Sequence, residues 1–260
     1  MQENVAIIQY GLGPIGSAVA RHVVERAGLE LVGCVDIDPT KVGRDAGEVI
    51  GLDSPLGFAV DSTLAQVLER TEAEVVIHTT SSYFDLFEAQ IVEILEAGLD
   101  IVSTAEELSF PWMANAEQGA KIDAVAKRAG KTVLGTGVNP GFLMDALPLF
   151  LTAISQQRVD KVKVTRVINA STRRGPFQAK IGSGMTVEAF NEKMAAGRMG
   201  HVGLPESVGM VFDTLGKTLS RYESTVEPVV AEQLTTTEHF QVQPGQVRGL
   251  KQVARGYTKD

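Results

Sequence analysis

Cysteines, basic segments and long apolar runs are all scarce in this chain, and each scarcity excludes a class of protein. The single cysteine, Cys34, excludes a disulfide framework or a Cys-rich metal site within one chain. The net charge is −8 and no basic run is longer than Arg173-Arg174, which disfavours nucleic acid as a partner. The longest apolar stretch, FLMDALPLFLTAI, contains Asp145 and Pro148 and is too short to span a bilayer. Because the N-terminus also lacks a basic segment followed by a long apolar one, we expect a cytoplasmic protein that binds no membrane.

The chain begins with a pattern of a different kind, VAIIQYGLGPIGSAVARHVVERAG, at residues 5–28. The short apolar run at its start predicts a buried parallel strand, and the segment after the glycines predicts a helix that Gly28 ends. We expect this helix to bury the face formed by Ile15, Ala18, Val19, His22 and Val23. Cys34, in the next apolar run, is expected to be a small buried residue of a second strand.

The loop GLGPIG is a candidate dinucleotide site. Gly11 would allow a tight turn, Gly13 would let the backbone approach a pyrophosphate, and Gly16 would let helix and strand pack closely. Pro14 and Ile15 belong to the same loop, whose helix start offers free N–H groups to phosphates. Because a G-x-G-x-x-G match is weak in a chain with 26 glycines, a plain glycine turn is the alternative interpretation.

An acidic residue at the end of the second apolar run favours the dinucleotide interpretation. Asp36 ends the apolar run within LELVGCVDID and would accept hydrogen bonds from the adenosine ribose hydroxyls. Its charge would repel a 2′-phosphate, so we expect NAD as the cofactor. Lys41 and Arg44 lie just downstream and leave NADP open.

Strand-like and helix-like segments alternate up to about residue 145, which predicts a Rossmann-type, doubly wound parallel sheet of the α/β class. We therefore expect a dinucleotide-binding domain at residues 1–145. Residues 146–260 change pattern and predict a second, α+β domain for substrate binding and oligomerisation. It contains an alternating segment, DKVKVTRVINA, that is typical of a strand, a helix that Thr186 caps and a helix that starts at Pro205. Exposed strand edges in this domain favour a homodimer.

Polar residues follow several of the predicted strands, where ligands bind in open parallel sheets. A hydroxyl cluster, Thr79, Thr80, Ser81 and Ser82, either contacts the cofactor or caps the helix that begins near Phe84. Asn139 follows the last strand and either binds the nicotinamide amide or a substrate oxygen, or serves only the turn.

A glutamate pair follows the strand-like LDIVSTA. Glu106 and Glu107 precede the apolar residues Leu108, Phe110 and Trp112, which would desolvate a carboxylate and favour a general base. The alternative is a surface pair that opens a helix.

Six motifs together resemble a known family: GLGPIG, VDIDPTKVGRDAGEVIG, TTSS, STAEELSFPW, GTGVNPGFLMD and GHVGLPES. They are similar to the 2,4-diaminopentanoate dehydrogenases and related NAD(P)-dependent amine dehydrogenases, relatives in fold of dihydrodipicolinate reductase. The resemblance implies oxidative deamination of a primary amine, such as 2,4-diaminopentanoate, to the ketone and ammonia, or the reverse. It places the catalytic glutamate at Glu106 or Glu107, with Glu106 preferred, and brings Arg173, Gln178 and His201 to the substrate. A helix-capping histidine and a solvated arginine are the alternatives for His201 and Arg173.

Two departures bear on this resemblance. The His-His pair and the K-x-x-x-P-S-G-T-A stretch of dihydrodipicolinate reductases are absent, which counts against that enzyme. The chain is also short for the family, which predicts a truncated or compact substrate domain. Two alternatives follow: a reductase of a cyclic imine, which exchanges no ammonia, and a dinucleotide-binding regulator without turnover.

Overall fold

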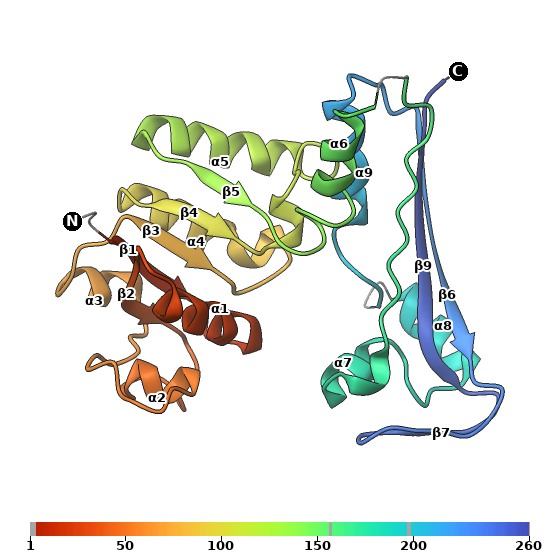
Figure 1. Ribbon diagram of the computed structural model, residues 1–260, viewed down its shortest axis with the longest axis horizontal. Coiled ribbons are helices and arrows are strands. Elements are labelled where there is room, and N and C mark those ends of the chain that lie inside the picture. Colours follow the sequence, from red (N-terminus) through yellow and green to blue (C-terminus); the bar gives the residue numbers. More distant parts are fainter. Residues whose placement is uncertain (1–3, 156–157, 197–198, 260) are drawn as a thin grey trace. The chain divides into compact units, whose positions relative to one another are not determined.

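A five-stranded parallel sheet forms the centre of the first of two structural units, Met1–Leu143 (Figure 1). The computed structural model describes residues 4–155, 158–196 and 199–259. The strands are β1 Val5–Tyr10, β2 Leu29–Val35, β3 Val75–His78, β4 Asp100–Ser103 and β5 Val133–Gly135, in the order β2-β1-β3-β4-β5. Because the order reverses between β1 and β3, the loops that follow these two strands flank the crevice where such sheets bind ligands.

Helices cover both faces of this sheet. They are α1 Pro14–Glu25, α2 Ala46–Ile50, α3 Leu64–Leu68, α4 Phe84–Glu96 and α5 Ala116–Ala129, with a 3₁₀ turn, η1 Glu106–Leu108, after β4. Consecutive residues of β1 point to opposite faces: Ile8 packs into a core with α3, α4 and α5, and Ile7 packs into a second core with α1, α2 and Cys34. The predicted doubly wound α/β fold and the burial of Cys34 are confirmed.

The buried face of α1 differs from the predicted one. Gly16, Ala20 and Val23 are buried, whereas Ile15 is 59% exposed and His22 is also exposed. The prediction was wrong for Ile15 and His22, whereas Val23 is buried as predicted and Ala18 and Val19 are half-buried. The helix instead turns its smallest residues toward the sheet, because the close approach of the helix to the loop leaves no room for a side chain at Gly16.

The second unit, Met144–Asp260, combines short helices with antiparallel strands. Its elements are α6 Ala146–Thr152, the 3₁₀ turn η2 Ala170–Thr172, α7 Gly175–Lys180, α8 Val187–Ala195, α9 Leu204–Thr214, β6 Arg221–Val230, β7 Thr235–Thr236, β8 Gln241–Val242 and β9 Val247–Tyr257. β6 pairs with β9 along its whole length, and β7 pairs with β8. The predicted cap of α8 is confirmed, since the Thr186 hydroxyl accepts a hydrogen bond from the Ala189 N–H.

The alternating segment at residues 160–170 is not a strand, which corrects that prediction. Its valines alternate with polar residues, but the segment has no ladder partner among the described strands, and Val167 is 90% exposed. Alternation supports a strand only where a neighbouring strand accepts its backbone hydrogen bonds. Within the described parts of the chain, no helix has both the length and the apolar character needed to cross a membrane.

Candidate active site

The loop between β1 and α1 has the shape of a phosphate cradle. Gly11 has φ 91°, a left-handed conformation that favours glycine, and a Cβ there would lie 2.9 Å from the Thr79 carbonyl oxygen. A Cβ on Gly16 would overlap the Gly11 carbonyl oxygen. Gly13 differs from both, because nothing lies within 4 Å of its absent Cβ. Two glycines therefore close the turn, and the third leaves its outer side open.

The start of α1 offers hydrogen-bond donors at this open side. Gly13 is the N-cap, no side chain caps the helix, and Pro14 occupies the first turn. The first N–H groups of the helix and the positive end of its dipole are thus available to an anion. Ile15 is exposed beside them. These features fit the pyrophosphate of a dinucleotide.

Asp36 lies against the same loop, just after β2. Its Oδ2 accepts hydrogen bonds from the Leu12 N–H at 2.7 Å and from Lys41 Nζ at 3.0 Å, and its Oδ1 accepts one from the Asp38 N–H at 2.9 Å. Arg44 instead pairs with the Glu48 carboxylate at 2.6 Å. Of the two cations that left NADP open, the structure therefore brings Lys41 to Asp36 and ties Arg44 to α2.

The side chains of Thr79 and Gln9 hold the Gly11 carbonyl in place, and we call this pair the polar clamp. The Thr79 hydroxyl donates to that carbonyl at 2.8 Å, and Gln9 Nε2 donates to it at 3.0 Å and to Thr79 Oγ1 at 2.8 Å. Gln9 is fully buried in β1, and its Oε1 has no hydrogen-bond partner in the described structure. Gln9 was not among the predicted site residues, although a glutamine inside an otherwise apolar strand was a usable signal.

The rest of the hydroxyl cluster divides between different partners. Thr80 Oγ1 lies 2.8 Å from His78 Nε2 and donates to Gln90 Oε1 at 2.6 Å. The Ser81 hydroxyl accepts a hydrogen bond from the Tyr83 N–H at 3.2 Å, and the Ser82 carbonyl accepts one from the N–H of a glutamate, Glu107. The first N–H of α4 is therefore not capped by this cluster.

The glutamate pair has two different environments. Glu107 Oε2 accepts a hydrogen bond from the Phe84 N–H at 2.7 Å and so caps α4. Burial raises the pKa of the Glu107 carboxyl, repulsion from Asp85 and Glu106 adds to this, and the Phe84 hydrogen bond opposes it. The carboxylate of the half-buried Glu106 makes no hydrogen bond or ion pair with any residue that the structure describes, although its backbone carbonyl accepts from the Ser109 N–H. One carboxylate is committed to a helix end and the other remains available.

The turn that carries this pair packs against β5. A Cβ on Gly135 would overlap the backbone of Leu108 and lie 2.7 Å from the Ser109 nitrogen, so only glycine lets η1 lie this close. After β5 comes Asn139, in a turn where its peptide bond to Pro140 is cis. The structure thus gathers the glycine loop, Asp36, the hydroxyl cluster, the glutamate pair and Asn139 in loops that follow the five strands.

The three remaining predicted residues lie in the second unit. Arg173 is exposed, with its guanidinium carbon 5.9 Å from the centroid of the Phe177 ring. Gln178 is 1% exposed; its Nε2 donates to the Arg173 carbonyl at 2.6 Å and its Oε1 accepts from Thr237. The backbone of His201 exchanges two hydrogen bonds with the side chain of Gln252 on β9. Their assignment to the substrate stays a prediction.

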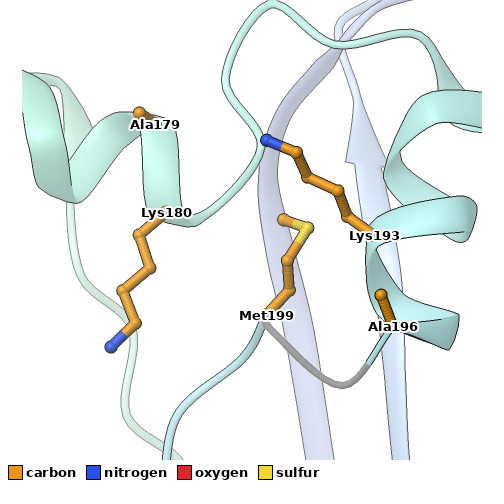
Figure 2. Close-up of a pocket in the computed structure, with 5 residues that line it drawn as sticks. All are labelled: Ala179, Lys180, Lys193, Ala196 and Met199. Atoms are coloured by element: carbon orange, nitrogen blue, oxygen red, sulfur yellow. The ribbon is translucent and has the colours of Figure 1, made fainter.

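A shallow hollow in the second unit contains none of the predicted residues (Figure 2). Lys180 on α7 and Lys193 on α8 come from opposite sides of it, and Met199 lies between them. Ala179 and Ala196 complete the lining. The described residues that line this hollow include no carboxylate and no imidazole.

The chain is similar to known protein families and to individual relatives along nearly all of its length. Residues 142–260 match the family described as "2,4-diaminopentanoate dehydrogenase C-terminal domain", and residues 5–106 match "Dihydrodipicolinate reductase, N-terminus". A 2,4-diaminopentanoate dehydrogenase of Acetoanaerobium sticklandii is 32% identical over 268 residues, which cover 98% of this chain and 73% of that protein. An amine dehydrogenase of Streptomyces virginiae is 28% identical over 70% of this chain and 51% of its own length.

A solved structure of an amine dehydrogenase is also similar to this chain. The amine dehydrogenase of Mycobacterium smegmatis superposes with a TM-score of 0.81 at 26% identity, covering 99% of this chain and 76% of that one. The resemblance drawn from the motifs is confirmed along nearly the whole sequence. The chain belongs to the 2,4-diaminopentanoate dehydrogenase family.

Proposed function

We propose that this chain is an NAD(P)-dependent amine dehydrogenase that oxidises a primary amine to a ketone and ammonia, or runs the reverse reductive amination. Its relatives are named 2,4-diaminopentanoate dehydrogenase and amine dehydrogenase, so 2,4-diaminopentanoate is the first substrate to test. One observation carries the proposal furthest: Glu106 presents an uncommitted carboxylate directly after β4, on the strand-end side that also bears the glycine loop.

The reaction needs a base before it needs a redox partner. A primary ammonium, with a pKa of about 10, cannot release a hydride until it loses a proton. In the proposed mechanism Glu106 takes this proton, directly or through one water. The bound nicotinamide ring supplies the hydride acceptor. The substrate carbon then carries an iminium cation, which the Glu106 carboxylate stabilises until water adds and ammonia leaves.

Glu107 has a different part in this proposal. Its carboxylate holds the first N–H of α4, and its own N–H donates to the Ser82 carbonyl at 3.3 Å. Both contacts tie η1 to the hydroxyl cluster. Glu107 therefore positions the turn that carries Glu106, and it takes no proton from the substrate.

Two matched substitutions test this division. Glu106→Gln removes the base while keeping the size of the side chain, so kcat should fall on the order of a hundred to ten thousandfold. Glu107→Gln retains an oxygen that accepts from the Phe84 N–H, so kcat should stay within about tenfold of wild type. Reduction of NAD or NADP at 340 nm with 2,4-diaminopentanoate, and ammonia in the same tube, measure both.

The outcomes separate the possibilities. Nicotinamide reduction without ammonia would refute an amine dehydrogenase and favour a reductase of a cyclic imine. If Glu107→Gln abolished turnover and Glu106→Gln did not, the proposed roles would be reversed. Dinucleotide affinity, measured by the fluorescence of bound NADH, is the control and should be unchanged in both variants.

NAD is the proposed cofactor. Asp36 stands at the end of β2, where its carboxylate suits ribose hydroxyls and repels a 2′-phosphate. The ammonium of Lys41 offsets part of this repulsion. We therefore expect a preference for NAD with measurable use of NADP, which the ratio of kcat/KM values for the two cofactors would test.

The substrate contacts and the assembly complete the proposal. Asn139 and His201 are proposed to contact the substrate, and Arg173 supplies a cation for the carboxylate of a diamino acid. The buried Gln178, which was predicted to contact the substrate, is proposed instead to hold the backbone of Arg173. A homodimer is proposed through the outer edges of the β6–β9 ribbon, which pair with no other strand in the part of the chain that the structure describes. Light scattering after gel filtration should give about twice the 27.8 kDa of one chain, and a mass of one chain would refute the dimer.

A further inference from the structure

A continuous chain of hydrogen bonds runs beneath the strand ends of the first unit. The Ala105 N–H donates to Ser103 Oγ at 3.1 Å, Ser103 Oγ lies 2.9 Å from His78 Nδ1, and His78 Nε2 lies 2.8 Å from both Gln90 Oε1 and Thr80 Oγ1. We call these five residues the His78 network. His78 and Ser103 are fully buried, whereas Thr80 is exposed.

The donors in the His78 network fix one tautomer of the imidazole. Ser103 Oγ already accepts from the Ala105 N–H, so its own proton is free to go to His78 Nδ1. Thr80 donates its proton to Gln90 Oε1, so both oxygens facing His78 Nε2 are acceptors. Of the two neutral tautomers, the one with its proton on Nε2 lets that nitrogen donate to these acceptors and leaves Nδ1 to accept from Ser103 Oγ.

The surroundings of the ring support the neutral form. Tyr10 of β1 and Phe87 of α4 pack against it, with ring centroids 5.8 Å and 6.1 Å away. The polar groups in contact with it, Ser103, Gln90 and Thr80, carry no charge.

The two ends of the His78 network lie at the two functional loops. Ala105 immediately precedes Glu106, the proposed base, and is the N-cap of η1. At the other end, Thr80 contacts the glycine loop closely enough that a Cβ on Gly11 would lie 3.0 Å from the Thr80 methyl carbon. A single buried ring thus connects the backbone before the base with a side chain beside the dinucleotide loop.

We propose that His78 is a positioning residue, which sets the Glu106 turn and the Thr80 loop relative to each other through the His78 network. The role in catalysis rests on the proposed amine oxidation. His78 takes no proton from the substrate and acts only through Ser103 and Thr80. Errors of about 1 Å in the placement of a catalytic group cost on the order of a hundredfold in rate, so the role should be measurable in kcat.

The first test compares His78→Leu with Val76→Ala. Val76 is fully buried in the same strand, and its truncation destabilises β3 without removing any hydrogen bond of the His78 network. We expect His78→Leu to lower kcat about 10- to 100-fold and to weaken NADH binding, while Val76→Ala keeps both within about threefold. Thermal melting verifies that both variants are folded at the assay temperature.

Two further variants separate the ends of the network. Ser103→Ala cuts the link to Ala105, so kcat should fall about tenfold with the Kd for NADH unchanged. His78→Asn keeps an acceptor near the position of Nδ1, so it should restore most of the kcat lost in His78→Leu. A purely structural role predicts instead that all variants lose activity in proportion to their loss of thermal stability.

A readout without substrate tests the tautomer. The protein has 4 histidines, so ¹⁵N–¹H correlations of the imidazole nitrogens can be assigned with the His78→Leu variant as reference. We expect a neutral Nε2–H ring at pH 7. A Nδ1–H tautomer or a cation would overturn the direction of the network.

The kinetic outcomes also separate this proposal from the proposed function. If wild type oxidises the amine and His78→Leu matches Val76→Ala in kcat and Kd, only the positioning role is refuted. If wild type oxidises no amine, the proposed function fails, and the Thr80 end is judged by NADH affinity alone. Equal affinities in the two variants would then refute positioning as well.

Discussion

The open side of Gly13 allows a sharp test of the dinucleotide loop, through Gly13→Ala. Gly13 has φ −64° and ψ 179°, which any residue adopts, and nothing lies within 4 Å of the added methyl group. Reduced freedom of the unfolded chain should stabilise the variant by about 0.4–1 kcal/mol. Alanine is a poorer N-cap than glycine by a comparable amount, roughly 0.5–1 kcal/mol. The two terms offset each other, so the free energy of unfolding should stay within about 1 kcal/mol of wild type.

Binding should respond very differently, because the methyl group would fill the side from which a pyrophosphate approaches. Losing one hydrogen bond to a charged group costs about 1.5–3 kcal/mol, so the Kd for NADH should rise about 10- to 150-fold. Gly249→Ala in β9 is the matched control: that glycine is equally open but lies in the second unit, and its variant should bind NADH like wild type. Titration of NADH fluorescence measures both. A folded Gly13→Ala protein with wild-type affinity would refute the loop as the pyrophosphate site.

Three other changes probe the same unit. Lys41→Ala removes the cation beside Asp36, so kcat/KM for NADP should fall about tenfold with that for NAD nearly unchanged; equal losses for both cofactors would contradict this. Gln9→Met deletes the donors to the Gly11 carbonyl and Thr79 and should lower the free energy of unfolding by about 1–3 kcal/mol in urea titrations, whereas an unchanged midpoint would show that the clamp is dispensable. Burial lowers the pKa of His78 below its ordinary value of 6.5, so protonation favours the unfolded chain. The stability that the neutral ring contributes is therefore complete above about pH 6.5 and is lost as the pH falls below it. The free energy of unfolding should change with a slope of at most about 1.4 kcal/mol per pH unit. This pH dependence should be absent in His78→Leu and present in Val76→Ala.

The sequence was sufficient for the parts of the site that backbone geometry dictates. The turn at Gly11 requires a positive φ, and a side chain at Gly16 would overlap the loop, so these glycines carry information in their spacing alone. The same holds for the order of strands and helices, since a buried parallel strand and an amphipathic helix differ in period. Asp36 was found because its distance from the loop is set by one helix and one strand.

Packing decisions were harder to predict. The pattern of large apolar residues in α1 indicated a face that includes Ile15, yet the helix buries Gly16 and Ala20 instead. Periodicity weighs side chains by hydrophobicity, whereas here the helix lies so close to the loop that only small residues fit. The prediction of a strand at residues 160–170 was wrong for a related reason. A strand needs a neighbouring strand to pair with, and an alternating sequence pattern does not supply one.

The sequence does not distinguish the two glutamates of the pair, whereas the structure does. Glu106 and Glu107 are chemically identical and adjacent, so composition, spacing and period treat them alike. What distinguishes them is a long-range fact, that the N–H of Phe84 has no other cap and one carboxylate reaches it. The Glu107 carboxylate therefore caps α4, and the Glu106 carboxylate is left for the proposed role as base. The same reasoning applies to His78, whose neighbours come from β4 and α4: a residue that positions others is defined by contacts across the fold, and local sequence carries no record of them.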